Sequence, residues 1–172
     1  MIPVSKVDIE SIPVIQDLAE KAWKAAYSSI ISPDQMKYML DLFYSEASLK
    51  KQMQEGHQFI IAKEKAKAVG FASYAVKSDG EPHIYRLHKI YIAPDQQGKG
   101  IGKLLIGFII NDISTHDATN LELNVNRNNK AMDFYRKIGF NIVREEDTNI
   151  GNGFFMNDYV MTLPLQVYSY MS

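Results

Sequence analysis

A glycine-rich segment, QGKGIGK, carries the clearest chemical signal in this sequence. It covers residues 97–103 and lies between a predicted strand and a predicted helix. Three glycines within five residues let the backbone turn several N–H groups toward one point, and a helix start adds positive potential there. These features predict a diphosphate site, with a plain glycine-rich turn as the alternative. The residues of the predicted site are Gln97, Gly98, Lys99, Gly100, Ile101, Gly102 and Lys103.

Two known phosphate-binding motifs do not fit this segment. A Walker loop requires Ser or Thr after its lysine, whereas Leu104 follows Lys103. A dinucleotide fingerprint that begins at Gly98 or Gly100 requires a third glycine where the chain has Lys103 or Leu105. Nucleotide hydrolysis and nicotinamide chemistry are therefore excluded for this segment.

The elements that position this segment follow from hydrophobic spacing. Apolar residues at helical spacing predict helices, and alternating or continuous apolar runs predict strands. The first predicted helix follows a cap at Asp8 or Ser11, has Pro13 in its first turn and continues to residue 26. The other predicted helices cover residues 33–44, 46–55, 101–116 and 131–138, and the predicted strands cover residues 2–7, 57–64, 69–76, 83–93, 121–125, 140–144 and 154–163. The polar segment 145–153 is predicted to be a loop. This order predicts an α+β fold with a mixed central sheet and helices on both faces.

Composition limits the class of protein. The 172 residues, 46% hydrophobic and 23% charged, predict one domain over residues 1–172, with residues 166–172 as a C-terminal tail. Lysine and arginine number 19 against 20 acidic residues, which argues against a nucleic-acid partner. The absence of cysteine excludes a cysteine nucleophile and cysteine–zinc sites, and we expect no metal. The longest apolar stretch, residues 104–110, is shorter than the roughly 20 residues that span a membrane, so we expect a cytoplasmic protein.

A second motif follows downstream. Residues 128–140, NNKAMDFYRKIGF, fit the pattern N-x-x-A-x-x-x-Y-x-x-x-G-F. Together with Q-x-x-G-x-G in the glycine-rich segment, this block resembles the GNAT superfamily of N-acetyltransferases, and one helix and one strand separate the two blocks as that superfamily requires. The similarity extends over residues 2–163, and within the superfamily the chain is most similar to PaiA-type polyamine acetyltransferases. The resemblance implies a GNAT-like acyl-CoA N-acyltransferase fold.

The resemblance also implies acetyl-CoA as cosubstrate, with its pyrophosphate on residues 97–103. The strand 83–93 is expected to splay from strand 121–125 and to pair through Ile90, Tyr91 and Ile92 with the pantetheine arm. Ile90 would supply the backbone N–H that polarises the thioester carbonyl, an oxyanion-hole role. Asn128 would hydrogen-bond the CoA arm or the sheet backbone near it.

Two side chains are candidates for proton transfer. The motif implies that Tyr135 is the general acid for the CoA thiolate, although Tyr135 also lies on the apolar stripe of its helix and could be a core tyrosine. His88 stands where many family members have a glutamate base, and histidine titrates in a suitable range. A histidine paired within the sheet is the alternative, and solvent could then take the proton.

The acceptor is the open question. Trp23 and Tyr27 lie one helical turn apart and, with Tyr38, are candidates to face the acceptor, although aromatics at this spacing are also typical of a core. Asp158 could meet a cationic substrate or face water. We predict N-acetyl transfer to a small primary amine such as spermidine, attracted by acidic residues that include the run 145–147. A protein N-terminus or lysine as acceptor, a non-catalytic acyl-CoA-binding module and a homodimer remain alternatives.

Overall fold

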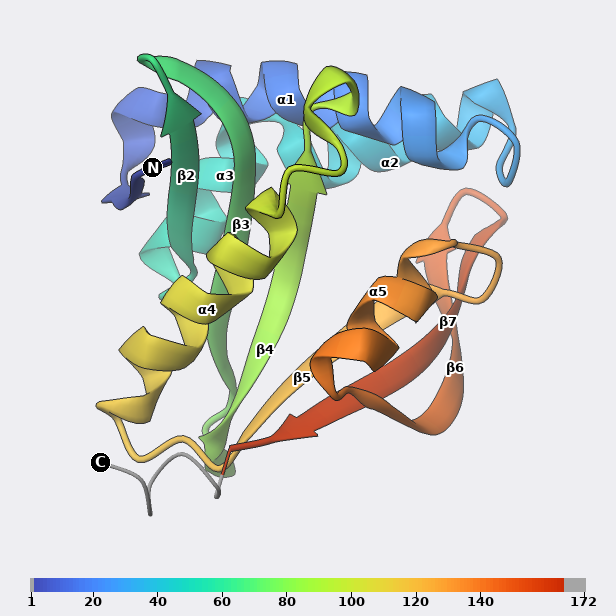
Figure 1. Ribbon diagram of the computed structural model, residues 1–172. Helices are drawn as coiled ribbons and strands as arrows, with labels where there is room; N and C mark the ends of the chain where they lie inside the picture. Colours follow the sequence, from blue (N-terminus) through green and yellow to red (C-terminus); the bar gives the residue numbers. More distant parts are fainter. Residues whose placement is uncertain (1, 166–172) are drawn as a thin grey trace. The chain divides into compact units, whose positions relative to one another are not determined.

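The computed structural model describes residues 2–165 and resolves the chain into two compact units (Figure 1). Unit 1 comprises Met1–Ala75 and Lys89–Ile109, and unit 2 comprises Val76–His88 and Ile110–Ser172. The predicted C-terminal tail, residues 166–172, lies outside the described residues. The single domain therefore stays a prediction, and the two units are described separately.

Within the described residues, seven strands form a mixed sheet in the order β1-β2-β3-β4-β5-β7-β6. Their bounds are β1 Val4–Val7, β2 Gln58–Glu64, β3 Lys67–Ser78, β4 Glu81–Ile92, β5 Asn120–Asn126, β6 Asn141–Gly151 and β7 Phe154–Pro164. Strands β4 and β5 pair in parallel, whereas β1–β2, β2–β3, β5–β7 and β6–β7 pair antiparallel. The prediction of an α+β fold with a mixed sheet is confirmed.

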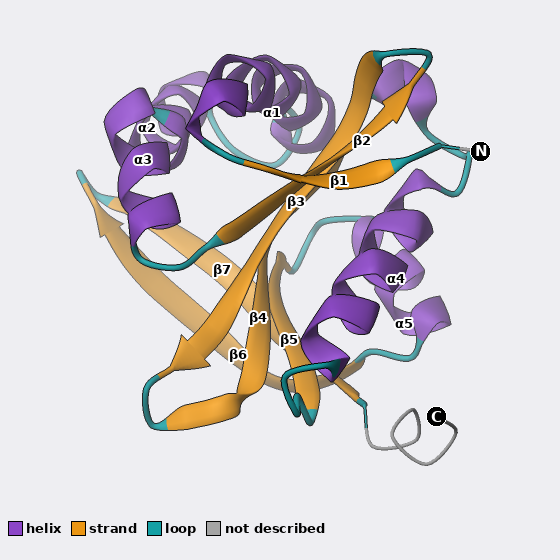
Figure 2. Cartoon of the chain, turned by 90° about the vertical axis from the view of Figure 1, so that its left-hand side faces the viewer, coloured by secondary structure: helices purple, strands orange, loops and turns teal. Residues whose placement is uncertain are grey.

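Helices cover both faces of the strands in unit 1. Helices α1 Ile12–Tyr27, α2 Pro33–Tyr44 and α3 Glu46–Gln54 lie on one face, and α4 Ile101–Ser114 lies on the other (Figure 2). Ser32 caps α2, because its hydroxyl accepts a hydrogen bond from the Gln35 amide at 3.1 Å. Ser45 caps α3 in the same way through the Ser48 amide at 3.2 Å.

Adjacent residues of β3 show how the two layers meet the sheet. The ring of Phe71 is buried on the α2 side, 6.1 Å from the ring of Tyr44. Gly70 faces the other way, and a Cβ there would lie 3.2 Å from the Ile101 side chain of α4 and 3.0 Å from the Ile92 side chain. Glycine at this position therefore allows the start of α4 to approach the sheet closely.

Unit 2 contains β5, β6, β7 and helix α5 Ala131–Ile138, together with the part of β4 up to His88 (Figure 1). One face of β5 is apolar and buried, through Leu121, Leu123 and Val125. Gly139 ends α5 at a φ of +122°, where a Cβ would lie 3.1 Å from the Leu163 side chain. The motif glycine therefore serves both the helix end and its contact with β7.

The predicted loop over residues 145–153 is wrong. Strand β6 continues to Gly151, pairing Glu145 with Tyr159 and Gly151 with Phe154. The turn is confined to Asn152 and Gly153, both at positive φ. Strand β6 is the edge strand of the sheet, and most of its side chains are exposed. An exposed edge strand can be as polar as a loop, so polarity did not distinguish the two.

Candidate active site

The glycine-rich segment follows β4 through the short 3₁₀ turn Pro94–Gln96. Gly98 and Gly100 have φ values of +81° and +77°, a region that favours glycine. A Cβ built on either residue would meet no atom within 4 Å. Backbone conformation therefore requires glycine here, and the space beside both residues lets a ligand approach the main chain.

The first turn of α4 presents amides to this space. The Leu104 N–H donates to the Gly100 carbonyl at 3.1 Å, which sets the start of the helix. The N–H groups of the preceding first-turn residues, 101–103, therefore have no acceptor within the helix. Helix starts of this kind attract phosphate groups through both the amides and the helix dipole.

The polar side chains of the segment hold its shape. Gln97 Nε2 donates to the Ile92 carbonyl at 3.4 Å, which ties the segment to the end of β4. Lys99 Nζ donates to Gln96 Oε1 at 2.8 Å and lies 3.9 Å from a Glu64 carboxylate oxygen. The predicted diphosphate site is thus a preformed turn that is exposed at residues 97–100 and anchored by the buried Ile101, and its residues fit the pyrophosphate of acetyl-CoA.

The end of β4 is half-buried at Ile90, Tyr91 and Ile92. The ring of Tyr91 lies 5.8 Å from that of Phe71 and 5.9 Å from that of Trp23, so its side chain belongs to the α1–α2 side of the sheet. These ring contacts hold the side chain of Tyr91 against the α1–α2 side of the sheet. The predicted contact with the pantetheine arm would use the backbone of the strand and not this side chain.

Lys89 was not singled out in the sequence, although it directly precedes Ile90. Its side chain is 9% exposed, and its Nζ lies 5.1 Å from the ring centroid of Tyr44 and 6.0 Å from that of Phe43. Desolvation lowers the pKa of this ammonium to about 8. The alternation of β4, with Leu87 and Tyr91 directed inward, was the signal that could have found this buried cation.

Trp23 and Tyr27 form part of an aromatic cluster. Trp23 is 5% exposed, and its ring lies 4.7 Å from that of Tyr27 and 6.0 Å from that of Tyr44. Tyr27 is half-buried. Trp23 is therefore buried in the core of unit 1.

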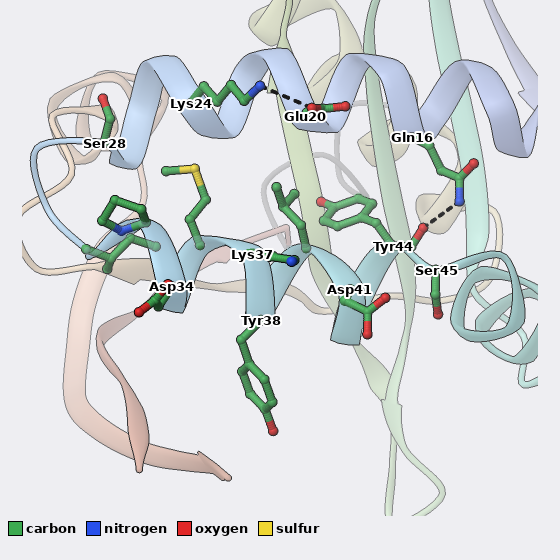
Figure 3. Close-up of a pocket in the computed structure, with 14 residues that line it drawn as sticks. Gln16, Glu20, Lys24, Ser28, Asp34, Lys37, Tyr38, Asp41, Tyr44 and Ser45 are labelled. Atoms are coloured by element: carbon green, nitrogen blue, oxygen red, sulfur yellow. Dashed lines mark hydrogen bonds and ion pairs between the residues drawn. The ribbon is translucent and has the colours of Figure 1, made fainter. Parts of the chain in front are cut away.

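A hollow of about 910 Å³ lies between α1 and α2 (Figure 3). Its α1 side carries an ion pair between Lys24 and Glu20, with Nζ and Oε1 3.1 Å apart. Gln16 Nε2 donates across it to the Tyr44 carbonyl at 2.9 Å. Tyr38 lines the hollow, and its ring extends from α2 away from α1.

In unit 2, Tyr135 is 8% exposed on α5, between the rings of Phe134 at 5.4 Å and Phe140 at 5.8 Å. The turn before α5 is held by asparagines. Asn126 Oδ1 accepts from the Asn128 amide, and Asn129 Oδ1 accepts from the Ala131 amide, each at 2.9 Å. Asn128 itself is exposed.

His88 and Asp158 lie near the end of the β4–β5 pairing. The parallel register runs from Ile84↔Asn120 to Leu87↔Leu123, and exposed His88 follows its last pair. Asp158 is directly opposite Asn126 in β7 and is 4% exposed. Burial raises the pKa of the Asp158 carboxyl above its usual range, against a hydrogen bond from Asn124 that lowers it.

The structure therefore gathers the predicted residues into two sets. Unit 1 holds residues 90–92, the glycine-rich segment, Trp23 and Tyr27, and unit 2 holds His88, Asn128, Tyr135 and Asp158. Among residues 2–165, no three His, Cys, Asp or Glu side chains converge in a way that could hold a metal ion. No helix in this same part of the chain has the length and apolarity needed to cross a membrane.

Comparison with known proteins gives one family. A family model described as "Acetyltransferase (GNAT) domain" matches residues 18–163. A spermidine N(1)-acetyltransferase of Thermoplasma acidophilum is 25% identical over 161 residues, 90% of this chain and 95% of the relative. A [ribosomal protein bS18]-alanine N-acetyltransferase of Haemophilus influenzae is 34% identical over 100 residues, 58% of this chain and 66% of the relative. The crystal structure of the PaiA N-acetyltransferase of T. acidophilum with coenzyme A superposes with a TM-score of 0.80, at 24% identity over 95% of this chain and 99% of that one.

Proposed function

The chain belongs to the GNAT acetyltransferase family, acetyl-CoA-dependent N-acetyltransferases, and on that basis we propose that its acceptor is a small primary amine, specifically a linear polyamine such as spermidine. The predicted family, enzyme class and cosubstrate are thereby confirmed. The observation that carries the cosubstrate side is the glycine-rich turn, with open space beside Gly98 and Gly100. The acceptor and the roles of individual residues remain proposals.

The chain's own groups would hold acetyl-CoA, which supplies an activated acetyl thioester. Residues 97–103 would bind the pyrophosphate through the amides of the turn and the first turn of α4. Backbone groups of residues 90–92 would align the pantetheine arm, and the Ile90 N–H would polarise the thioester carbonyl. Asn128, exposed beside the start of α5, is available to hydrogen-bond the same arm.

Transfer then needs two proton steps. The neutral amine attacks the carbonyl carbon, so that a C–N bond forms as the C–S bond breaks. We assign Tyr135 as the acid that protonates the departing CoA sulfur, since its phenol is the motif donor. His88, exposed at the end of the β4–β5 ladder, would take the proton that the attacking amine loses.

Two observations support a polyamine. The T. acidophilum relative is named for spermidine and aligns over 90% of this chain. Asp158 supplies a buried carboxylate in unit 2. The acidic run is a weaker source of attraction than the sequence implied, because Arg127 pairs with Glu145 and Asp147, and Arg144 pairs with Glu146.

A protein N-terminus is the second candidate acceptor. The relative that acts on the alanine of ribosomal protein bS18 has the higher identity, 34%, but over 58% of this chain. The two candidates share the chemistry of a primary amine. They differ in the charge that the rest of the acceptor carries.

A panel of acceptors tests the proposal directly. CoA release would be measured with spermidine, spermine, hexylamine and a peptide that begins with alanine. We expect spermidine to have the highest kcat/KM, and its KM to rise with ionic strength because salt screens exposed charges. Equal turnover of hexylamine and spermidine would refute the polyamine acceptor, and a preference for the peptide would favour the second candidate. An absence of CoA release with every amine would favour a non-catalytic acyl-CoA-binding module.

A further inference from the structure

Asp158 is a buried carboxylate with an unused oxygen. It is 4% exposed, yet within the described residues Oδ2 has no hydrogen-bond partner. The other interaction of the carboxyl is a hydrogen bond from the side chain of Asn124 on β5. Leaving an acceptor of a buried charge unsatisfied is costly, so an atom in this state calls for a ligand or a structural explanation.

Asn124 presents a second unused acceptor beside it. Its Oδ1 is buried and, like Asp158 Oδ2, has no partner among residues 2–165. Asn124 is also the first residue of β5 after the last pair with β4, Leu87↔Leu123. Two acceptor oxygens, one of them charged, therefore lie together where the β4–β5 ladder ends, and a cationic group with at least two N–H donors would satisfy both.

The same sheet face contains a matched example of a satisfied carboxylate. Glu122, 5% exposed and also on β5, has Oε2 3.3 Å from Lys77 Nζ and Oε1 3.4 Å from a guanidinium nitrogen of Arg144. The buried carboxylate of Glu122 is thus satisfied by two cationic side chains of the same chain. Among residues 2–165, the chain supplies no such side chain in contact with Asp158 Oδ2.

Three charged side chains near Asp158 influence its carboxyl group. Arg86 of β4 and Arg127 after β5 act on the carboxyl electrostatically, and Glu146 is directly opposite it on β6. Arg127 directs its guanidinium to Glu145 and Asp147 instead. Burial is the largest influence, and it raises the pKa of Asp158. A cation bound at Oδ2 would oppose that effect.

We propose that Asp158 and Asn124 bind the ammonium group of the acceptor that does not react. The reacting nitrogen must be neutral to attack, whereas a carboxylate holds the proton on a bound ammonium. The pair therefore suits a second, permanently charged nitrogen. This inference rests on the proposed function and assigns two residues to the recognition of the second nitrogen of a di- or polyamine.

The first test compares two acceptors of matched length, 1,4-diaminobutane and n-butylamine. In the parent protein, kcat/KM should favour the diamine by about 10- to 100-fold, the usual strength of a hydrogen bond to a charged group. Asp158→Asn should bring this ratio close to one, mainly by raising KM for the diamine. Glu122→Gln, the matched control on the same face, should retain the ratio. A ratio that Asp158→Asn leaves intact would overturn the inference while the proposed function stands.

The second test does not depend on turnover. Carboxyl ¹³C NMR would follow the titration of Asp158 alone, with 1,4-diaminobutane and with 1,4-butanediol. The diamine should lower the pKa of Asp158, and the uncharged diol should not. No response to the diamine would mean that Oδ2 binds only water, which overturns the inference. A response without acetylation of any amine would retain the ammonium site and remove the proposed function.

Stability separates this site from a structural carboxylate. Because the pKa of Asp158 is raised by folding, its ionised form weakens the folded state at neutral pH, and the effect disappears below the pKa of the unfolded chain. Asp158→Asn should therefore raise Tm at pH 7, and Glu122→Gln should lower it. A lowered Tm for Asp158→Asn at pH 7 would mean that the carboxylate is satisfied within the fold and would overturn the inference.

Discussion

Replacing Lys89 with methionine should stabilise the folded protein at neutral pH. Folding lowers the pKa of this ammonium from 10.5 to about 8 through desolvation. At about 1.4 kcal/mol for each pKa unit, keeping the charge buried costs roughly 3 kcal/mol. The rings of Tyr44 and Phe43, 5.1 and 6.0 Å from Nζ, offset about 1–2 kcal/mol of this through cation–π attraction. Methionine keeps the volume without the charge, so we expect a net gain of about 1–2 kcal/mol and a rise in Tm of about 2–8 °C.

The gain should depend on pH with a defined sign. In the unfolded chain, Lys89 keeps its proton until pH 10.5, whereas in the folded chain it loses it near pH 8. Between these values the unfolded state binds more protons, so the stability of the parent rises with pH. The advantage of Lys89→Met should therefore shrink from pH 8 upward and vanish above about pH 10.5.

Urea unfolding at pH 7 and pH 9.5 would measure this difference. Lys63→Met is the matched control, because Lys63 is an exposed lysine on β2 and its replacement should not give the stabilisation expected for Lys89→Met at pH 7. The His57 side chain offers a second check, since burial and then the charge of Lys89 lower the pKa of His57. That pKa should rise in Lys89→Met. A variant less stable than the parent at pH 7, or a difference that does not change with pH, would refute the reasoning.

Three further predictions concern the proposed acetyl-CoA site and the two proposed proton-transfer groups. Gly100→Glu should abolish acetyl-CoA binding in calorimetry, whereas Gly56→Glu, which also has a positive φ and no atom within 4 Å of the added Cβ, should retain it. Tyr135→Phe should lower kcat by about 10²–10⁴-fold at unchanged Tm, and a lowered Tm with unchanged kcat would make Tyr135 a core residue only. His88→Ala should reduce the rate near neutral pH and spare it at high pH, where the amine deprotonates unaided, so a pH–rate profile parallel to that of the parent would remove His88 from the mechanism.

Local sequence signals predicted the segments whose form depends on their own residues. Gly98 and Gly100 occupy the left-handed region that their glycine spacing implied, and Gly139 ends α5 where the downstream motif placed a stop. The predicted start of α2 at residue 33 is likewise correct, with proline in the first turn of the helix. In each case the backbone conformation is determined by the residue at that position or by its immediate neighbours in sequence.

Features that depend on distant strands were missed. The residues of β6 beyond Arg144 look like a loop, because their pairing with β7 depends on a register that composition does not reveal. Asn124 and Asp158 are far apart in sequence, and only the β5–β7 register brings their side chains together. The sequence around Lys89 does not reveal that this lysine is buried, because its burial depends on contacts with Tyr44 and Phe43 of α2.

The presence or absence of an oppositely charged partner distinguishes structural buried charges from functional candidates. Glu122, Lys89 and Asp158 are all at most 9% exposed, but only Glu122 has oppositely charged partners that satisfy it among the described residues. Folding alone would favour removing the other two charges, because their pKa values are shifted toward the neutral forms. Lys89 directly precedes the strand end that the acyl arm is proposed to use, and Asp158 is opposite Asn126, whose side chain holds the amide of Asn128. Unpartnered charge thus occurs beside proposed site residues in each unit, where stability is commonly given up for activity.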